Sequence, residues 1–364
     1  SSDVCSSDLS SLMTAKRRAL IAGVTGIAGQ TVARQLVAQG WDVYGLSQRN
    51  RAVPDGVTHV QANLLDPESV KTAVAGIKPE IVFMTAWIRK DTEVENVAVN
   101  SATIQNLLDA LAVDGGVRHV ALLTGLKHYL GPFDDYATGV MAETPFHESE
   151  PRLDNLNFYY AQEDIVFEQA KKQGFTWSVH RSHTIFGYAV DNAMNMVLTL
   201  SVYATICKEL GQKFIFPGSE AQWNFITDVT DSDLLGEQLI WAATNPAGEN
   251  EAFNIVNGDT FRWRWLWPQI AEHFGVEWEG FQGEERPLEV QMKDAGPVWA
   301  EIAKKYDLAE ADVTKLASWW HSDSDLGRGI ECVTDMNKSR EAGFLNFRPT
   351  PASFFDKVQR YQAD

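Results

Sequence analysis

Three glycines spaced three residues apart separate the first apolar run of the chain from its first amphipathic stretch. Gly23, Gly26 and Gly29 follow a strand expected over 19–22 and precede a helix expected over 30–39. Glycine permits a tight turn and close approach of the backbone to a ligand, and the N-terminus of the following helix favours an anion. This order of strand, glycine turn and helix is typical of a dinucleotide-binding fold. The residues expected to contact the pyrophosphate side of such a cofactor are Gly23, Thr25, Gly26, Ile27 and Gly29.

Strand-length apolar runs alternate with helix-length amphipathic stretches through the first half of the chain. Further strands are expected over 42–46, 58–61, 80–84, 117–123 and 177–180, and helices over 68–76, 97–112 and 158–173. Such alternation predicts an α/β fold, a Rossmann-like doubly wound parallel sheet with a smaller C-terminal substrate-binding portion.

The alternation weakens after about residue 185, where a long apolar helix over 192–210 and a late strand over 252–256 are expected. We therefore expect three parts. Residues 1–15 form a disordered or foreign leader, 16–185 a dinucleotide-binding Rossmann domain, and 186–364 a mainly substrate-binding portion that returns strands to the sheet. Residues 263–320 hold seven of the twelve tryptophans, which either pack a small core or line an apolar ligand site.

The composition excludes several classes of protein. The 364 residues include 49 acidic and 31 basic side chains, so the formal net charge is −18. A nucleic-acid-binding protein or one held on an anionic membrane needs a basic surface. Three widely spaced cysteines indicate neither a disulfide framework nor a zinc site, and no metal is expected. The same sparse cysteines favour a reducing cytoplasm. No apolar run approaches the roughly 18–20 residues of a membrane span.

The end of the second expected strand bears on the choice between NADH and NADPH. An NADH-preferring site usually has an acidic residue there, which accepts a hydrogen bond from the ribose 2′-hydroxyl. This chain instead has Ser47 and Arg49, and a hydroxyl with a guanidinium suits a 2′-phosphate. The sequence therefore predicts that the cofactor is NADPH. The alternative is that Ser47 and Arg49 belong to a solvated basic loop that contacts no cofactor.

The usual catalytic pair of short-chain dehydrogenases/reductases, YxxxK, is missing. Tyr159 and Tyr160 stand at the start of the helix expected over 158–173, where this pair would lie. Glu163 and Asp164 occupy the positions four residues further on. This departure argues against a plain alcohol dehydrogenase.

Two longer motifs indicate a different relationship. The sequence TGLKHYLGPF over 124–133 and the sequence PRLDNLNFYYAQED over 151–164 resemble those of the PRISE family, the progesterone-5β-reductase and iridoid-synthase-like reductases. These are atypical extended members of the short-chain superfamily. The resemblance runs from about residue 18 to 358. It departs at Gln48, where the family often has an arginine, and at Asp134 and Asp135.

The resemblance implies a reaction and the residues that carry it. The family's catalytic lysine falls on Lys127 and its tyrosine on Tyr159, and the family reaction is NADPH-dependent 1,4-reduction of the C=C bond of enones and enals. Hydride addition to the β-carbon makes an enolate, and donors aimed at its oxygen lower the barrier. Thr124 is expected at the cofactor, and Phe133 in the pocket of a small apolar substrate. Trp87 ends the fourth expected strand, where doubly wound folds have their sites, and either lines the same pocket or serves packing.

Other functions remain open at the level of sequence. Tyr159 could be a core aromatic at a helix start, and Lys127 a surface lysine. The chain could then be a carbonyl reductase or sugar-nucleotide epimerase of the same superfamily, or a non-catalytic NADP(H)-sensing protein. A homodimer is compatible with the sequence.

Overall fold

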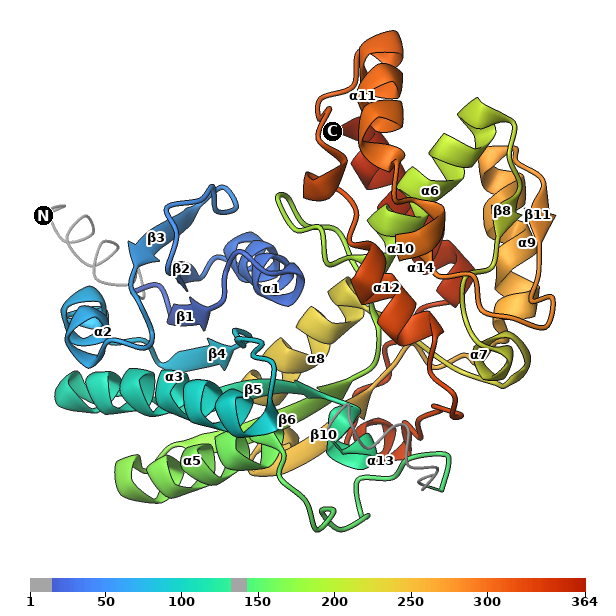
Figure 1. The fold of residues 1–364 in the computed structure, drawn as a ribbon. Helices are drawn as coiled ribbons and strands as arrows, with labels where there is room; N and C mark the ends of the chain where they lie inside the picture. The colour runs from blue at the N-terminus through green and yellow to red at the C-terminus, as the bar shows by residue number, and fades with distance from the viewer. Residues whose placement is uncertain (1–14, 132–142) are drawn as a thin grey trace, which may run out of the picture.

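The computed structural model describes residues 15–131 and 143–364 of the chain. Its centre is a seven-stranded parallel sheet with strand order β10-β6-β5-β4-β1-β2-β3 (Figure 1). The strands are β1 (Arg18–Ala22), β2 (Asp42–Ser47), β3 (Val57–Gln61), β4 (Ile81–Met84), β5 (His119–Gly125), β6 (Thr176–Ser182) and β10 (Glu251–Ile255). The chain winds outward from β1 to β3 and then from β4 to β10 on the other side. The strand order therefore reverses between β1 and β4, the place where doubly wound sheets bind ligands.

Helices cover both faces of this sheet. α1 (Ile27–Ala38) and α8 (Ser232–Thr244) share a hydrophobic core with one face of β1 and β4. On the other face, α2 (Pro67–Val74), α3 (Glu93–Asp114) and α5 (Phe158–Gln173) share a second core with alternate residues of the same strands. Side chains of one strand alternate between its two faces, so a strand buried on both sides is apolar throughout. The predicted doubly wound parallel sheet is confirmed.

Capping residues decide where the helices begin. α5 has the predicted bounds, with the Asn157 side chain accepting from the N–H of Tyr159 at its start and a left-handed Gly174 at its end. α3 begins at Glu93, earlier than the predicted 97, because Thr92 and Glu95 form a reciprocal capping box. α6 (Met196–Leu210) begins later than the predicted 192, because Asn195 caps it.

Most of the chain after β6 builds a second group of helices beside the sheet (Figure 1). They are α6, α7 (Glu220–Asn224), α9 (Trp263–Phe274), α10 (Leu288–Gln291), α11 (Ala295–Tyr306), α12 (Trp319–Leu326) and α14 (Thr350–Ala363). Two short parallel pairs join them, β7 (Ile185–Phe186) with β9 (Thr230–Asp231) and β8 (Phe214–Ile215) with β11 (Trp278–Glu279). Trp263, Trp267 and Trp299 of the tryptophan-rich segment are buried in the core of this group, so these three contribute to its packing. The small helices α4 (Lys127–Leu130) and α13 (Asn337–Glu341) lie near the end of β10 and β5.

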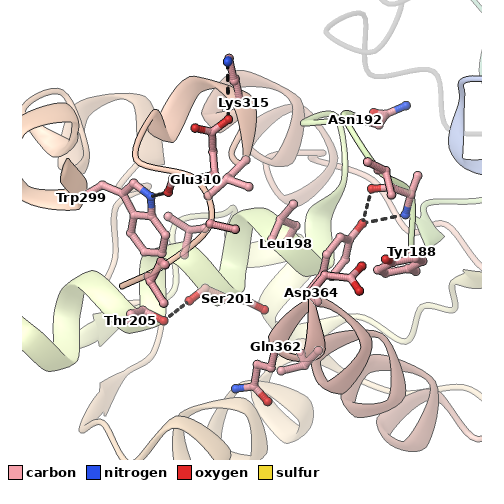
Figure 2. Close-up of a pocket in the computed structure, with 18 of the residues that line it drawn as sticks. Tyr188, Asn192, Leu198, Ser201, Thr205, Trp299, Glu310, Lys315, Gln362 and Asp364 are labelled. Carbon is pink, nitrogen blue, oxygen red and sulfur yellow. Dashed lines mark hydrogen bonds and ion pairs between the residues drawn. The ribbon is translucent and has the colours of Figure 1, made fainter. Parts of the chain in front are cut away.

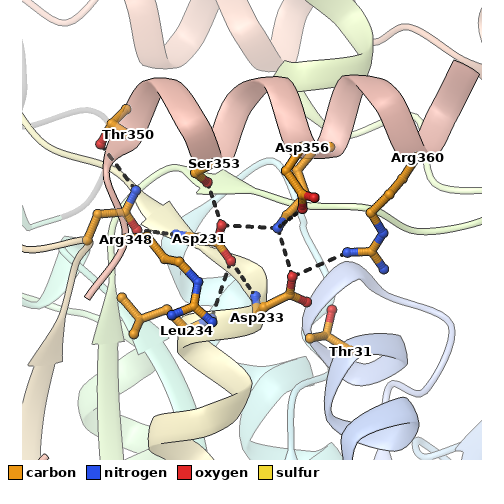
Figure 3. Close-up of polar contacts among 12 residues, drawn as sticks. Thr31, Asp231, Asp233, Leu234, Arg348, Thr350, Ser353, Asp356 and Arg360 are labelled. Atoms are coloured by element: carbon orange, nitrogen blue, oxygen red, sulfur yellow. Dashed lines mark hydrogen bonds and ion pairs between the residues drawn. The ribbon is translucent and has the colours of Figure 1, made fainter. Parts of the chain in front are cut away.

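A buried lysine fastens α14 to the start of α8 (Figure 3). Lys357 Nζ donates to Asp231 Oδ2 at 3.0 Å, to Asp233 Oδ2 at 2.8 Å and to Asp356 Oδ2 at 3.2 Å. Ser353 Oγ also donates to Asp231. Burial acts to lower the pKa of Lys357, but the carboxylates of Asp231 and Asp233 outweigh burial and hold this pKa above its usual value. The ion cluster therefore holds α14 against the N-terminus of α8.

Among the described residues, no helix has the length and apolar character needed to cross a membrane. Within the same part of the chain, no group of three or more His, Cys, Asp or Glu side chains is placed to hold a metal ion.

Candidate active site

A cleft of about 510 Å³ lies along the carboxyl edge of the sheet. Residues at or just beyond the ends of five strands line it, Gly23 after β1, Ser47 in β2, Thr85 after β4, Gly125 in β5 and Ser182 in β6. The opposite wall comes from the second group of helices, through Trp320, His321, Ser324, Asp325 and Arg328. The cleft thus lies between the sheet edge and α12.

The glycine turn places the N-terminus of α1 at this cleft. Gly23 has φ +86°, and a Cβ there would lie 2.7 Å from the backbone nitrogen of Ala86. A Cβ on Gly29 would lie 2.0 Å from the carbonyl oxygen of Gly23, so this glycine lets the helix pack against the turn. Gly26 is the N-cap of α1 and makes no side-chain capping bond. The first N–H groups of α1 therefore face an environment suited to an anion.

Four of the five predicted turn residues line the cleft, and Gly29 is the exception. Gly23, Thr25, Gly26 and Ile27 lie in its wall. Gly29 is buried behind them and serves the packing of helix on turn.

The end of β2 presents a hydroxyl rather than a carboxylate to the cleft. Ser47 and Gln48 line it, whereas the side chain of Arg49 is exposed beside it. Ser47 Oγ donates to the carbonyl oxygen of Arg49 at 2.9 Å and lies 2.7 Å from Nε2 of His59. His59, on β3, was not singled out in the sequence because β3 carries no motif. Its ring nitrogen joins the side chains of Gln48 and Arg49 as a third nitrogen-bearing group at the end of β2.

The two predicted catalytic residues, Lys127 and Tyr159, both line the cleft. Lys127 begins α4 directly after β5, and Tyr159 lies in the first turn of α5. The structure joins these elements, because Asn157 Nδ2 donates to the carbonyl oxygen of Lys127 at 2.9 Å and Asn157 Oδ1 accepts from Tyr159 N. A Cβ built on Gly125 would lie 3.3 Å from the Tyr159 hydroxyl. The absence of a side chain at Gly125 thus leaves room for this phenol at the end of β5.

Glu93 holds Lys127 in place. Lys127 is only 7% exposed, and its Nζ lies 2.5 Å from Glu93 Oε2. Glu93 Oε1 accepts from the N–H of Phe158 at 2.8 Å, one of the first-turn donors of α5. One carboxylate therefore holds the ammonium of the buried lysine and caps the helix that carries Tyr159. Sequence reasoning missed Glu93 because α3 was expected to begin after it, and the capping box at Thr92 and Glu95 is the signal that locates it.

One wall of the cleft is aromatic. The Trp87 ring stacks on Phe158 with centroids 5.9 Å apart and is 44% exposed. Phe158 in turn lies under the Lys127 ammonium, 4.3 Å from Nζ to the ring centroid. Trp87 was a predicted pocket residue, and it lies in the cleft wall. Phe133, the other predicted pocket residue, lies outside the described residues.

A chain of charged groups that sequence reasoning did not assign to the site runs from His183, directly after β6, to Arg328 and Asp325 on the opposite wall. His183 lies 2.8 Å from Asp228 through Nδ1 and 2.7 Å from Arg328 through Nε2. Arg328 also donates to Asp325 at 2.8 Å. Burial raises the pKa of Asp228. Burial also acts to raise the pKa of Asp325, but Arg328 together with His321, His183 and the hydrogen bond from Thr184 outweighs burial, and the pKa lies below its usual value. These contacts orient Arg328 at the cleft.

Several other residues singled out in the sequence serve the scaffold. Thr124, predicted to contact the cofactor, is buried and does not line the cleft; its Oγ1 donates to His180 O across β5 and β6. Tyr160 donates to the carbonyl oxygen of His128. Glu163, which replaces the YxxxK lysine, is buried and pairs with Arg152 at 3.0 Å.

A family model described as a PRISE-like Rossmann-fold domain matches residues 57–319. The chain belongs to this family. Within it, the chain is 41% identical over 358 residues to an (S)-8-oxocitronellyl enol synthase of Nepeta cataria, covering 95% of this chain and 92% of that one. It is equally 41% identical, with the same coverage, to a 3-oxo-Δ(4,5)-steroid 5β-reductase of Arabidopsis thaliana. The resemblance recognised in the sequence is confirmed.

Among solved structures, a UDP-glucose 4-epimerase of Thermotoga maritima is similar, with a TM-score of 0.69. The match covers 95% of this PRISE chain and 99% of the epimerase, at 15% identity. At that identity the similarity shows the shared fold alone.

Proposed function

We propose that the chain is an NADPH-dependent oxidoreductase that reduces the C=C bond of small apolar enones or enals by 1,4-addition. The observation that carries this proposal is the meeting of Lys127, Tyr159 and the N-terminus of α1 in one cleft. It agrees with the names of the relatives, one a steroid 5β-reductase and another an enol synthase.

The residues of the cleft suit a phosphorylated dinucleotide. Gly23 and Gly26 allow the backbone to approach a pyrophosphate, and the first N–H groups of α1 favour its charge. Ser47, His59 and the nearby Arg49 offer donors to a 2′-phosphate where NADH-preferring proteins place an acid. Because the whole chain carries −18, we infer that this local site and not overall charge supplies the affinity.

A reduced nicotinamide supplies a hydride when it is bound. The protein's task is then to hold the substrate carbonyl and to stabilise the charge that gathers on its oxygen. The Tyr159 hydroxyl, beside Gly125, is the proposed donor to this oxygen. Lys127 adds a positive charge nearby, and Glu93 and Phe158 fix its direction. Trp87 and Phe158 form the apolar wall proposed for the substrate's hydrocarbon.

The other functions left open by the sequence fit less well. A carbonyl reductase or epimerase of this superfamily uses the YxxxK lysine, but Glu163 occupies that position and is bound to Arg152. A protein that only senses NADP(H) has no need of both Lys127 and Tyr159 in the cleft wall.

We further propose that 16–185 form the cofactor-binding part and 186–364 mainly the substrate-binding part. In support, α12 faces the sheet edge across the cleft, and β10 pairs with β6. We place the enzyme in the cytoplasm, a compartment that suits the free buried thiols of Cys207 and Cys332.

The experiment is a screen of NADPH oxidation with cyclic, linear and steroid enones, each paired with its saturated ketone. Consumption with the enones and not with the ketones supports the proposal. Consumption with the saturated ketones alone would point to carbonyl reduction instead.

A further inference from the structure

A second cavity, of about 550 Å³, lies away from the sheet among α6, α11 and α14 (Figure 2). Its base is apolar and well packed, formed by Leu198 and Val202 of α6, Trp299 and Ile302 of α11, and Val358 of α14. Volumes of roughly 300–1,000 Å³ are typical of small-molecule sites. A second copy of the chain would instead bury about 800 Å² per partner over a broad surface.

Several polar groups around this cavity are bonded to the protein itself (Figure 2). Trp299 Nε1 donates to Glu310 O at 2.9 Å, and Ser201 Oγ donates to Val197 O at 2.7 Å. Tyr361 Oη accepts from the N–H of Ala189 at 3.0 Å. No buried side-chain atom that lacks a hydrogen bond among the described residues belongs to the cavity lining. A ligand therefore needs to satisfy no buried polar group, and a neutral apolar molecule fits.

One short segment, 188–194, contributes to the lining of both the second cavity and the active-site cleft. Residues 188–192 line the second cavity, and Asn192 and Met194 line the cleft, so Asn192 belongs to both.

The side chain of Gln30 connects this segment to the proposed cofactor site. Gln30 Oε1 accepts from the N–H of Val190 at 3.0 Å, and Gln30 Nε2 donates to the carbonyl oxygens of Val190 and Thr25, both at 2.9 Å. Val190 lines the second cavity and Thr25 the cleft. A shift of the segment would thus act on the glycine turn through one buried amide.

We propose that the second cavity is a binding site for a small neutral apolar molecule, and that its occupation alters turnover in the cleft through Val190 and Gln30. The binding does not depend on the proposed function, whereas the effect on turnover rests on it.

Binding is tested with 2-adamantanone, a compact neutral ketone without a C=C bond, by isothermal calorimetry on the full chain saturated with NADP⁺. Ser201→Phe places a ring in the cavity, and we expect it to weaken binding at least tenfold, about 1.4 kcal/mol. Two controls should bind as the wild type does. Ser201→Ala leaves the cavity open, and Lys208→Phe adds a ring at an exposed position of α6 outside it.

The proposed binding site is overturned if the wild type shows no saturable binding, or if Ser201→Phe binds the probe as tightly as the wild type does. It is also overturned if the wild type is a dimer that Ser201→Phe converts to monomers, because a second copy of the chain would then occupy the cavity. Sedimentation of both proteins decides the last case.

Coupling is tested by enone turnover with and without the probe. We expect the probe to change kcat or the KM for NADPH at least twofold in the wild type and not in Ser201→Phe. In Gln30→Leu we expect the probe to bind and its effect on turnover to disappear. An unchanged effect in Gln30→Leu, or none in the wild type, overturns the coupling. A chain that reduces no enone refutes the proposed function, while calorimetry still decides the binding site.

Discussion

Lys127 Nζ lies 2.5 Å from Glu93 Oε2, and the second oxygen of the same carboxylate accepts from the N–H of Phe158. The proposed catalytic lysine and the helix that presents Tyr159 are therefore held by a single side chain from α3. Both partners of the ion pair are largely buried, with 6% and 12% of their side-chain surface exposed. Glu93 is a positioning residue, and its replacement should lower both the stability of the fold and the rate of turnover.

Glu93→Ala is expected to lower the free energy of unfolding by about 3–5 kcal/mol, because it leaves a buried ammonium without its partner. Glu93→Gln should recover part of this loss, since its amide oxygen still accepts from Phe158. Chemical denaturation measures both. Glu95→Ala, at an exposed position two residues along α3, is the matched control and should cost about 1 kcal/mol. Equal stability of Glu93→Ala and Glu95→Ala would contradict the assigned role.

Tyr159→Phe removes the proposed donor to the substrate oxygen and keeps the ring that packs on Phe158. We expect kcat for enone reduction to fall about 10²–10³-fold, the usual cost of losing one such donor. NADPH affinity, measured by fluorescence titration, should stay within about twofold. Tyr160→Phe is the neighbouring control, because that hydroxyl bonds to His128 O away from the cleft. A Tyr159→Phe enzyme as active as the wild type rules the donor role out.

The preference for NADPH should depend on the end of β2. Ser47→Asp and Arg49→Ala are each expected to weaken NADPH binding. Losing one hydrogen bond to a charged group costs about 1.5–3 kcal/mol, or about ten- to a hundredfold in affinity. NADH binding should not weaken in either variant. Arg51→Ala is the control, since its guanidinium bonds to the carbonyl oxygen of Asp191. Equal losses of affinity for NADPH and NADH would show that the end of β2 does not bind the 2′-phosphate.

Lys357→Met tests the ion cluster of Figure 3 through its pH dependence. Burial acts to raise the pKa of Asp233, but Lys357, with Arg360 and Arg348, outweighs burial, so the folded pKa lies below the usual value near 3.8. A depressed carboxyl pKa stabilises the fold above the unfolded pKa, and the stabilisation is lost as pH falls through the folded pKa. The Tm difference between wild type and Lys357→Met should therefore be largest near neutral pH and shrink below about pH 4. A difference independent of pH would mean that the variant loses packing alone.

The sequence predicted best what local signals determine. Asn157 and Gly174 cap α5, so its bounds were predicted correctly, and the glycine turn located the start of the fold. The missed features depend on contacts between distant segments. The capping box at Thr92 was overlooked, and with it Glu93. The chain from His183 through Arg328 joins residues 145 positions apart, for which no sequence spacing is diagnostic.

Thr124 shows a limit of another kind. It stands in the most specific motif of the chain, yet its hydroxyl donates to His180 O on β6 and the residue does not line the cleft. Successive side chains of a strand point to opposite faces, so membership of a motif does not by itself place a side chain at a site. Its neighbours Leu123 and Gly125 both line the cleft.

Isotope tracing tests the central claim most directly. The enzyme is incubated with a cyclic enone and NADPH that carries deuterium at the transferable position of the nicotinamide, and the product is examined by NMR and mass spectrometry. The account predicts a saturated ketone with deuterium on the β-carbon. An allylic alcohol with deuterium on the carbinol carbon, or no transfer of the label at all, would contradict it.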